Sequence, residues 1–213
     1  MNRRDLILFT AVLLLGALPL VGEPYTMRLG TFACMYAVMA VSWNVIGGMA
    51  GYPSFATAAF FGLGAYAGGV LLAKGAALTV AIAFAGALAF GGAMLLGAVL
   101  LRLRGHYFAI ASLAVAEVLR ELTNTATDLT GGGMGLNIPL DTSSSAGVAG
   151  EASFFFLAMW GLLLLTLVVV VAVERSKLGF GLTCIRQNES AADMIGVNAT
   201  LYKSLAFALS GVF

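Results

Sequence analysis

Charged residues are scarce in this sequence. Only 10% of its 213 residues are Asp, Glu, Lys or Arg, whereas a soluble domain carries about 25%. So few charges cannot cover the surface of a globule in water, and we expect the remaining surface to face lipid. Hydrophobic residues make up 61% of the chain, and the mean hydropathy is +0.99. This composition excludes a soluble enzyme, a nucleic-acid binder and a disordered chain, and it predicts an integral membrane protein.

Cysteine and histidine are also nearly absent. Cys34 lies in an apolar run and Cys184 in a distant basic stretch, on opposite sides of the membrane in the topology predicted below, so we expect no disulfide. His106 is the single histidine, and no cluster of cysteines or carboxylates accompanies it to form a metal site. The net charge of +1 indicates no acidic partner. We therefore expect no metal, no cofactor and no enzyme activity.

Long apolar runs, in contrast, are plentiful. A membrane-spanning helix needs about 20 mostly apolar residues, and the runs predict an all-α polytopic helix bundle forming one domain, 1–213. We expect about six full spans and the start of a seventh. The predicted spans are 6–22, 29–47, 53–72, 76–101, 106–122, 154–173 and 204–213. The last run rises only about 15 Å, so we expect it to be cut within a span or supported by a partner.

The basic residues predict the orientation of these spans. A cytoplasmic N-terminus places eight basic residues inside and three outside, which agrees with the positive-inside rule. The inside set is Arg3, Arg4, Arg102, Arg104, Arg175, Lys177, Arg186 and Lys203, and the outside set is Arg28, Lys74 and Arg120. It also predicts an outer loop at 123–153 and an inner loop at 174–203. The first run resembles a signal peptide but lacks a clear cleavage site, so we expect a retained helix.

Residues 47–55 predict an interruption between two helices. Three glycines and a proline in this segment make a continuous helix costly. The segment is either a cytoplasmic turn or a broken helix beside a substrate path, where protein or water satisfies the freed backbone groups. Asn44, Ser54 and Thr57 are polar residues at this break and are candidates for the path. Hydrogen bonding between helices is the alternative for Asn44.

Glu117 is the costliest residue to place in a membrane. It lies about 16 Å along its predicted helix from His106, near the bilayer centre if the helix is upright. A carboxylate at this depth indicates a functional residue of the translocation path. Alternatively, Arg120, three residues further on, forms a purely structural ion pair with it.

Small residues recur every four positions in the fourth predicted span. These are Ala77, Ala81, Ala85, Ala89, Ala93 and Gly97. Small side chains let helix backbones approach closely in lipid. A four-residue repeat drifts around the helix, so we expect the stripe to meet more than one neighbour.

Residues 182–195 of the inner loop predict one short helix outside the membrane, which Gly196 ends. Its predicted apolar face comprises Leu182, Ile185, Ala192 and Ile195. Nothing else in the loop covers this face, and the helix has few basic residues for a membrane surface. We therefore expect it to dock on a cytosolic partner.

Several of these segments resemble a known family. Ser-Ala-Ala-Asp-Met-Ile-Gly at 190–196, directly after Glu189, resembles the EAA-x3-G loop of ABC importer permeases. Further matching segments are 51–55, 58–66, 101–107, 117–120, 129–132 and 185–189. Their order and spacing are similar to those of the LivM-type branched-chain amino-acid permeases across nearly the whole chain. Two departures are Thr57, where relatives often carry histidine, and the length, because the family normally continues beyond Phe213.

The resemblance implies the permease subunit of an ABC importer for branched-chain amino acids in a bacterial-type inner membrane. Such permeases pair with a second, similar permease, two cytosolic ATPases and an extracytoplasmic solute-binding protein. The implied ATPase-coupling residues are Leu182, Ile185, Arg186, Glu189, Ala192 and Gly196. No G-x-x-x-x-G-K-[ST] segment occurs, so ATP hydrolysis would belong to another chain.

Two alternatives stay open. One is a urea or short-amide importer of the same family, because the matching segments do not report the substrate. The other is an ion-coupled secondary carrier, which needs a coupling site at the membrane midplane. Glu117 is the only residue that qualifies for such a site.

Overall fold

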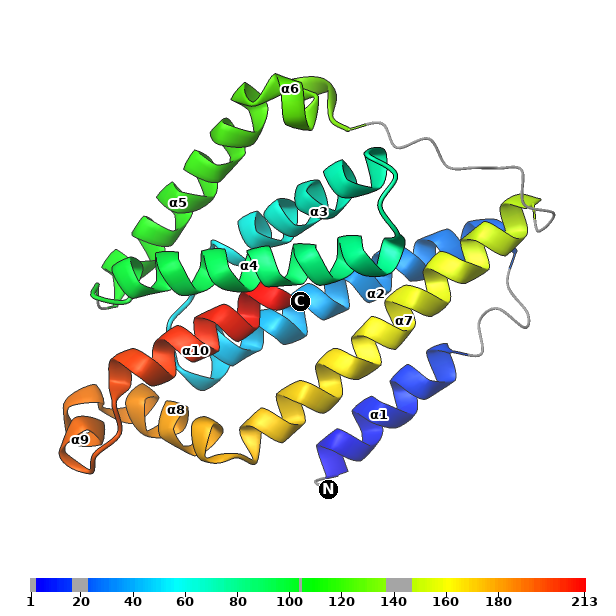
Figure 1. Cartoon of the computed structure of the whole chain (residues 1–213). Helices are drawn as coiled ribbons and strands as arrows, with labels where there is room; N and C mark the ends of the chain where they lie inside the picture. Colours follow the sequence, from blue (N-terminus) through cyan, green and yellow to red (C-terminus); the bar gives the residue numbers. More distant parts are fainter. Residues whose placement is uncertain (1–2, 17–22, 104, 137–146) are drawn as a thin grey trace. The chain divides into compact units, whose positions relative to one another are not determined.

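The computed structural model describes residues 3–16, 23–103, 105–136 and 147–213, and these residues form helices without any strand (Figure 1). The elements are α1 (Arg3–Leu15), α2 (Pro24–Asn44), η2 (Val45–Met49), α3 (Thr57–Ala73), α4 (Leu78–Leu100), α5 (His106–Thr125), α6 (Thr127–Thr130), η3 (Gly132–Met134), α7 (Gly147–Glu174), α8 (Lys177–Gln187), α9 (Glu189–Met194) and α10 (Ala199–Val212). The predicted all-α class is therefore confirmed.

A helix overlaps every predicted span, but the helices differ in their capacity to cross a membrane. Among the described residues, three stretches are long and apolar enough: Pro24–Met49, Leu78–Leu100 and Ala152–Glu174. α3 is apolar but has only 17 residues, and α5 carries three charged residues near its end. These properties are those of a membrane protein, while the count of about six spans stays a prediction. Parts of the first predicted span (17–22) and of the outer loop (137–146) lie outside the described residues.

The chain divides into two compact units, of which the first comprises Met1–Val41 and Leu140–Val173. Here the indole Nε1 of Trp160 donates a hydrogen bond to the Val12 carbonyl oxygen at 2.7 Å, joining α7 to α1. The Ser153 hydroxyl lies 3.3 Å from the Met27 sulfur, joining α7 to α2. Partners of this kind matter because an unsatisfied polar group is costly in lipid. The prediction of a single domain is not tested by this division and stays a prediction.

The second unit comprises Ser42–Pro139 and Glu174–Phe213, and α4 is packed there against both α3 and α10. A Cβ atom at Gly68 of α3 would lie 3.5 Å from the Ala85 Cβ. A Cβ at Gly211 of α10 would lie 2.8 Å from the Ala93 Cβ. The small-residue stripe therefore meets two neighbouring helices, as predicted, and it permits the close approach of both.

Four aromatic rings pack together in the core of the second unit. The Phe60 and Phe108 rings each pack edge-to-face on Phe207, with centroids 5.4 and 6.0 Å apart, and the Tyr52 ring packs on Phe108 at 5.4 Å. Edge-to-face packing adds to the stabilisation that burial of the rings provides. The core joins α3, α5 and α10 to the segment after η2, and it thereby fixes the position of Tyr52.

Candidate functional site

The predicted interruption between the second and third spans is present. α2 continues as the π-helix η2, residues 50–56 are not helical, and α3 begins at Thr57. Hydrogen bonds from other parts of the unit hold this irregular segment: the indole of Trp43 donates to the Ser54 carbonyl oxygen at 2.7 Å, and the Phe55 N–H donates to Ser112 Oγ at 3.0 Å. Protein groups therefore satisfy these two groups of the freed backbone, as a break at membrane depth requires. Whether the segment is a turn or lines a path stays open.

The inner loop differs from the prediction of one helix over 182–195, which is wrong. Two helices, α8 and α9, are separated by Asn188, whose backbone is extended at φ −161° and ψ 111°. Its side-chain oxygen accepts a hydrogen bond from the Ala191 N–H at 3.1 Å and caps α9. Asparagine is among the best N-terminal caps, and this competes with the continuation of α8.

The predicted apolar face of the inner loop is largely covered, which also corrects the sequence-based expectation. Leu182, Ile185 and Ala192 are buried inside the second unit. α10 and η2 contact α8, and α8 lies so close to α10 that a Cβ at Gly181 would clash with the Tyr202 ring. These residues therefore hold the α8–α9 pair on the rest of the unit.

The far end of the pair remains uncovered in this unit. Met194 and Ile195 are 88% and 66% exposed. Gly196 follows with φ +84°, and its N–H donates to the Asp193 carbonyl oxygen at 3.1 Å. A left-handed residue after the last helical turn is typical of a glycine stop, so the predicted end of the helix at Gly196 is confirmed.

Tyr52, Glu189 and Lys203 form what we call the buried polar cluster. The Lys203 ammonium donates to Glu189 Oε1 at 2.7 Å and to the Tyr52 hydroxyl oxygen at 3.3 Å, and the Tyr52 hydroxyl donates to Glu189 Oε2 at 2.6 Å. The Leu101 carbonyl oxygen accepts from Lys203 at 3.5 Å. An ammonium group has three donors, and each therefore has an acceptor.

The charges in this cluster are unequally buried. The Lys203 side chain is 2% exposed and that of Glu189 is 16% exposed. Leu101 caps the C-terminal end of α4, where the helix dipole favours a cation. The carboxylate and this helix end together compensate a lysine that is almost completely removed from solvent.

A second contact joins α8 to the break. Arg186 Nη1 donates to the Gly48 carbonyl oxygen in η2 at 2.8 Å. Gly51 has φ +75°, and a Cβ there would lie 3.0 Å from the Arg186 Cγ. The arginine therefore passes directly over the start of the irregular segment.

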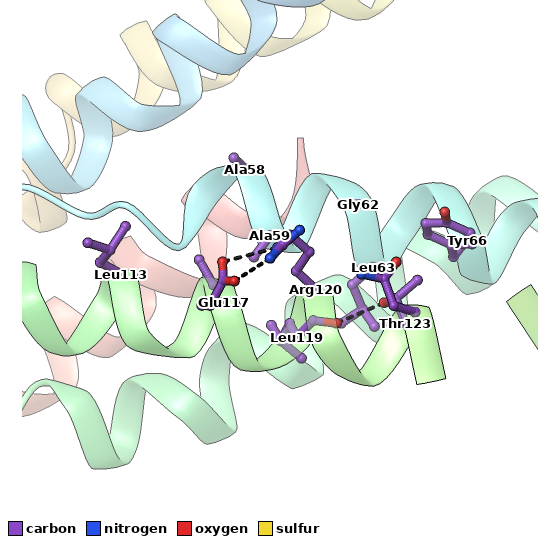
Figure 2. A pocket seen from close by; sticks show the side chains of 12 residues that line it. Ala58, Ala59, Gly62, Leu63, Tyr66, Leu113, Glu117, Leu119, Arg120 and Thr123 are labelled. Carbon is purple, nitrogen blue, oxygen red and sulfur yellow. Dashed lines mark hydrogen bonds and ion pairs between the residues drawn. The ribbon is translucent and has the colours of Figure 1, made fainter. Parts of the chain in front are cut away.

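Glu117 lines a groove between α3 and α5, with a volume of about 310 Å³ (Figure 2). The lining residues are Ala58, Ala59, Gly62, Leu63, Tyr66, Leu113, Ala116, Glu117, Leu119, Arg120, Thr123 and Asn124. Arg120 binds Glu117 through both Nε and Nη2, and both side chains are exposed in this unit. The predicted ion pair is thus present, and a role of Glu117 in a path stays a prediction.

The structure does not bring the four candidate path residues to one place. Asn44 is the exposed last residue of α2, Ser54 is buried in the break, and Thr57 is the half-buried first residue of α3. None of these three lines the groove that contains Glu117. They belong to the surroundings of the break.

Sequence reasoning missed Tyr52 and Lys203 as site residues. Lys203 was counted only as an orientation signal, although it is the single charged residue between 199 and 213. A lone cation in an apolar helix is itself a signal of a buried partner. Its partner Glu189 is adjacent to the EAA-like segment, but only the fold shows that the two meet.

Comparison with known proteins gives the family. The family model described as "Branched-chain amino acid transport system / permease component" matches residues 25–213. Two curated relatives are the high-affinity branched-chain amino acid transport system permease proteins LivM of Salmonella typhimurium (27% identical) and Escherichia coli (29% identical). Each match covers 99% of this chain and 55% of the relative, so the chain spans about half the length of these relatives. No solved structure matches the chain significantly. On the match over residues 25–213, the chain belongs to the branched-chain amino acid transport system permease family.

Proposed function

We propose that this chain is the permease subunit of an ABC importer that moves branched-chain amino acids across the inner membrane. The observation that carries the proposal is the family match over residues 25–213. The two LivM relatives are named as high-affinity branched-chain amino acid permeases, which supports this substrate class. A solute-binding protein outside, a second permease and two cytosolic ATPases complete the proposed complex.

The α8–α9 pair is the proposed contact for the ATPase. Its exposed apolar residues Met194 and Ile195 are available to a groove on a partner, whereas Leu182, Ile185 and Ala192 face inward. Of the six predicted coupling residues, these three and Glu189 therefore act by holding the pair in place. ATP-driven closure of the ATPases would press on the exposed end and drive alternating access.

Two variants separate contact with the ATPase from folding. Ile195→Glu places a charge on the exposed end, and we expect it to weaken ATPase binding with no loss of permease stability, because a charge buried at an interface is costly. Ile185→Glu places the same charge in the interior of the unit, and we expect it to destabilise the permease itself. Normal ATPase binding and uptake with Ile195→Glu would show that this end is not the contact.

We also propose that α8, α9 and the N-terminus are cytoplasmic. The break, the end of α4 and the α8–α9 pair meet in the buried polar cluster, as expected for segments on one face of the membrane. Single cysteines at Met134 and Ser190, both exposed, test this in a background without Cys34 and Cys184. An impermeant reagent on intact cells should label the first and not the second, and the reverse pattern would contradict the orientation.

The groove of Glu117 and the break with Asn44, Ser54 and Thr57 are proposed to line the path. The groove combines apolar side chains with one ion pair, which is chemically compatible with a zwitterion that carries an apolar side chain.

The decisive experiment is uptake by proteoliposomes that contain the assembled complex. Leucine, isoleucine and valine should enter only with ATP inside and the loaded binding protein outside, and dissipation of ion gradients should leave uptake unchanged. A complex with a hydrolysis-deficient ATPase is the control. Uptake of urea or short amides in place of branched-chain amino acids would identify the related importer, and uptake driven by an ion gradient without ATP would refute the ABC mechanism.

A further inference from the structure

We infer that Lys203 is a positioning residue for coupling: it fastens the α8–α9 pair to the break between η2 and α3, so that the two move as one body. This inference rests on the proposed function, because it concerns how movement of the ATPases reaches the membrane segments. It assigns a role to a buried charge that substrate binding and ATPase contact leave unexplained.

The side chain of Lys203 connects four different segments of the second unit. Its own helix is α10, and its ammonium reaches α9 through Glu189, the break through Tyr52, and the end of α4 through Leu101. None of these contacts lies within one helix. Loss of the lysine would therefore release several segments from one another at once.

The hydrogen bond between Tyr52 and Glu189 joins the α8–α9 pair to the break directly. The Tyr52 hydroxyl donates to Glu189 Oε2 at 2.6 Å while Lys203 binds Oε1 of the same carboxylate. Both oxygens of the first residue of α9 are therefore held, one from the break and one from α10. This fixes the orientation of the carboxylate as well as its position.

Arg186 supplies a second attachment between the same two parts. Its contact with the Gly48 carbonyl oxygen reaches η2, whereas Tyr52 lies beyond the end of η2. Two attachments at different points of the break restrain rotation as well as separation. A displacement of α8 and α9 would therefore be transmitted to the junction of α2 and α3.

Stability alone is a poor explanation for the cluster. Well-packed apolar residues of similar volume often hold buried segments as firmly as an ion pair does. A buried ion pair with full hydrogen bonding instead has one favourable geometry, because in a low-dielectric interior a displaced charge loses its partner. Such a connection favours discrete positions of the α8–α9 pair relative to the break over a continuous range of positions.

The first experiment measures uptake per ATP hydrolysed in the full complex. Lys203→Met and the milder Tyr52→Phe should lower this ratio about two- to thirtyfold, the range expected when a residue on a coupling connection is replaced. Lys177→Met, the same substitution at an exposed lysine of α8, should leave the ratio unchanged. An unchanged ratio in both cluster variants would overturn the inference.

Tyr52→Phe keeps the test valid if Lys203→Met fails to assemble. It removes the hydroxyl that contacts Glu189 and retains the ring that packs on Phe108. A cluster that is only structural would lower the amount of assembled complex without changing uptake per ATP. A lower ratio in correctly assembled Tyr52→Phe complex supports coupling.

The second experiment needs no transport. Spin labels at Ser190 of α9 and at Phe55 of the break, both exposed, report the distance between α9 and the break in the purified complex. We expect a narrow distance distribution in the parent protein and in Lys177→Met, and a broad one in Lys203→Met and Tyr52→Phe. Equal widths in all four would overturn the inference. Broadening in a complex that shows no ATP-dependent uptake would refute the proposed function and retain the connection.

Discussion

Removal of the two charges of the buried polar cluster should have unequal effects on stability. Glu189→Gln removes the negative charge opposite the Lys203 ammonium, whose side chain is 2% exposed, and leaves it with neutral acceptors alone: the new amide oxygen and the Tyr52 and Leu101 oxygens. Breaking a buried pair in this way costs about 3–5 kcal/mol. Lys203→Met leaves a carboxylate that is 16% exposed and still accepts from the Tyr52 hydroxyl. This variant should lose only about 1–3 kcal/mol.

The double variant Glu189→Gln/Lys203→Met removes both charges and retains an amide that can bind Tyr52. Because no unpaired charge remains, its stability should lie within about 1–2 kcal/mol of the parent protein. The two single losses would add up to about 4–8 kcal/mol if they were independent. The difference measures the coupling between two residues in direct contact.

Denaturant titration of the purified permease in mixed micelles can measure these differences. Lys177→Met and Glu121→Gln are the matched controls, because both residues are exposed, and surface substitutions usually change stability by less than about 0.5 kcal/mol. A larger loss in Lys203→Met than in Glu189→Gln would contradict the burial argument. Additive losses in the double variant would show that the pair is not formed.

Two further substitutions test the break and the groove. Gly51→Ala should lower the free energy of unfolding by about 1–2 kcal/mol through left-handed backbone strain, and further through the close approach of the new Cβ to Arg186. Gly75→Ala is the control that measures the strain alone in the same titration, because Gly75 has φ +81° and nothing lies within 4 Å of its Cβ position. Equal losses in the two variants would exclude an effect of the contact with Arg186. Glu117→Gln should lower uptake severalfold without changing assembly if the groove lines the path, whereas the exposed control Glu121→Gln should transport normally; unchanged uptake by Glu117→Gln would leave only the structural pair with Arg120.

The parts of the fold that could be predicted from sequence depend on local patterns. Apolar runs predicted the helices that overlap the seven spans, and the glycines and proline of 47–55 predicted the break, because the cost of Gly and Pro in a helix is intrinsic to the backbone. The drift of the α4 stripe likewise follows from helix geometry alone, and both α3 and α10 meet it. The number of spans could not be obtained in this way, since short or charged helices such as α3 and α5 are stable in lipid only when neighbouring helices pack against them.

The inner loop shows where local reasoning was insufficient. Leu182, Ile185 and Ala192 share a face in one long helix, and they are also buried together when the chain breaks at Asn188. Apolar spacing cannot distinguish these two arrangements. The decision depends on the side-chain cap of Asn188 and on α10, which covers the apolar face. Neither contribution is visible in the hydrophobic pattern of residues 182–195.

The buried polar cluster could have been suspected from sequence but not assembled from it. In a chain with so few charges, each charged residue within an apolar helix implies a partner, because an isolated buried charge is prohibitively costly. Lys203 was used as a count toward the inner side, which assumes that its ammonium faces water, and the ammonium is instead enclosed by α4, α9 and the break. Its partners come from positions 52, 101 and 189, so the packing of three other segments against α10 must be known before they can be named. The scarcity of charge thus identifies Lys203 as a residue that needs a buried partner, and the packing of α10 identifies which groups are its partners.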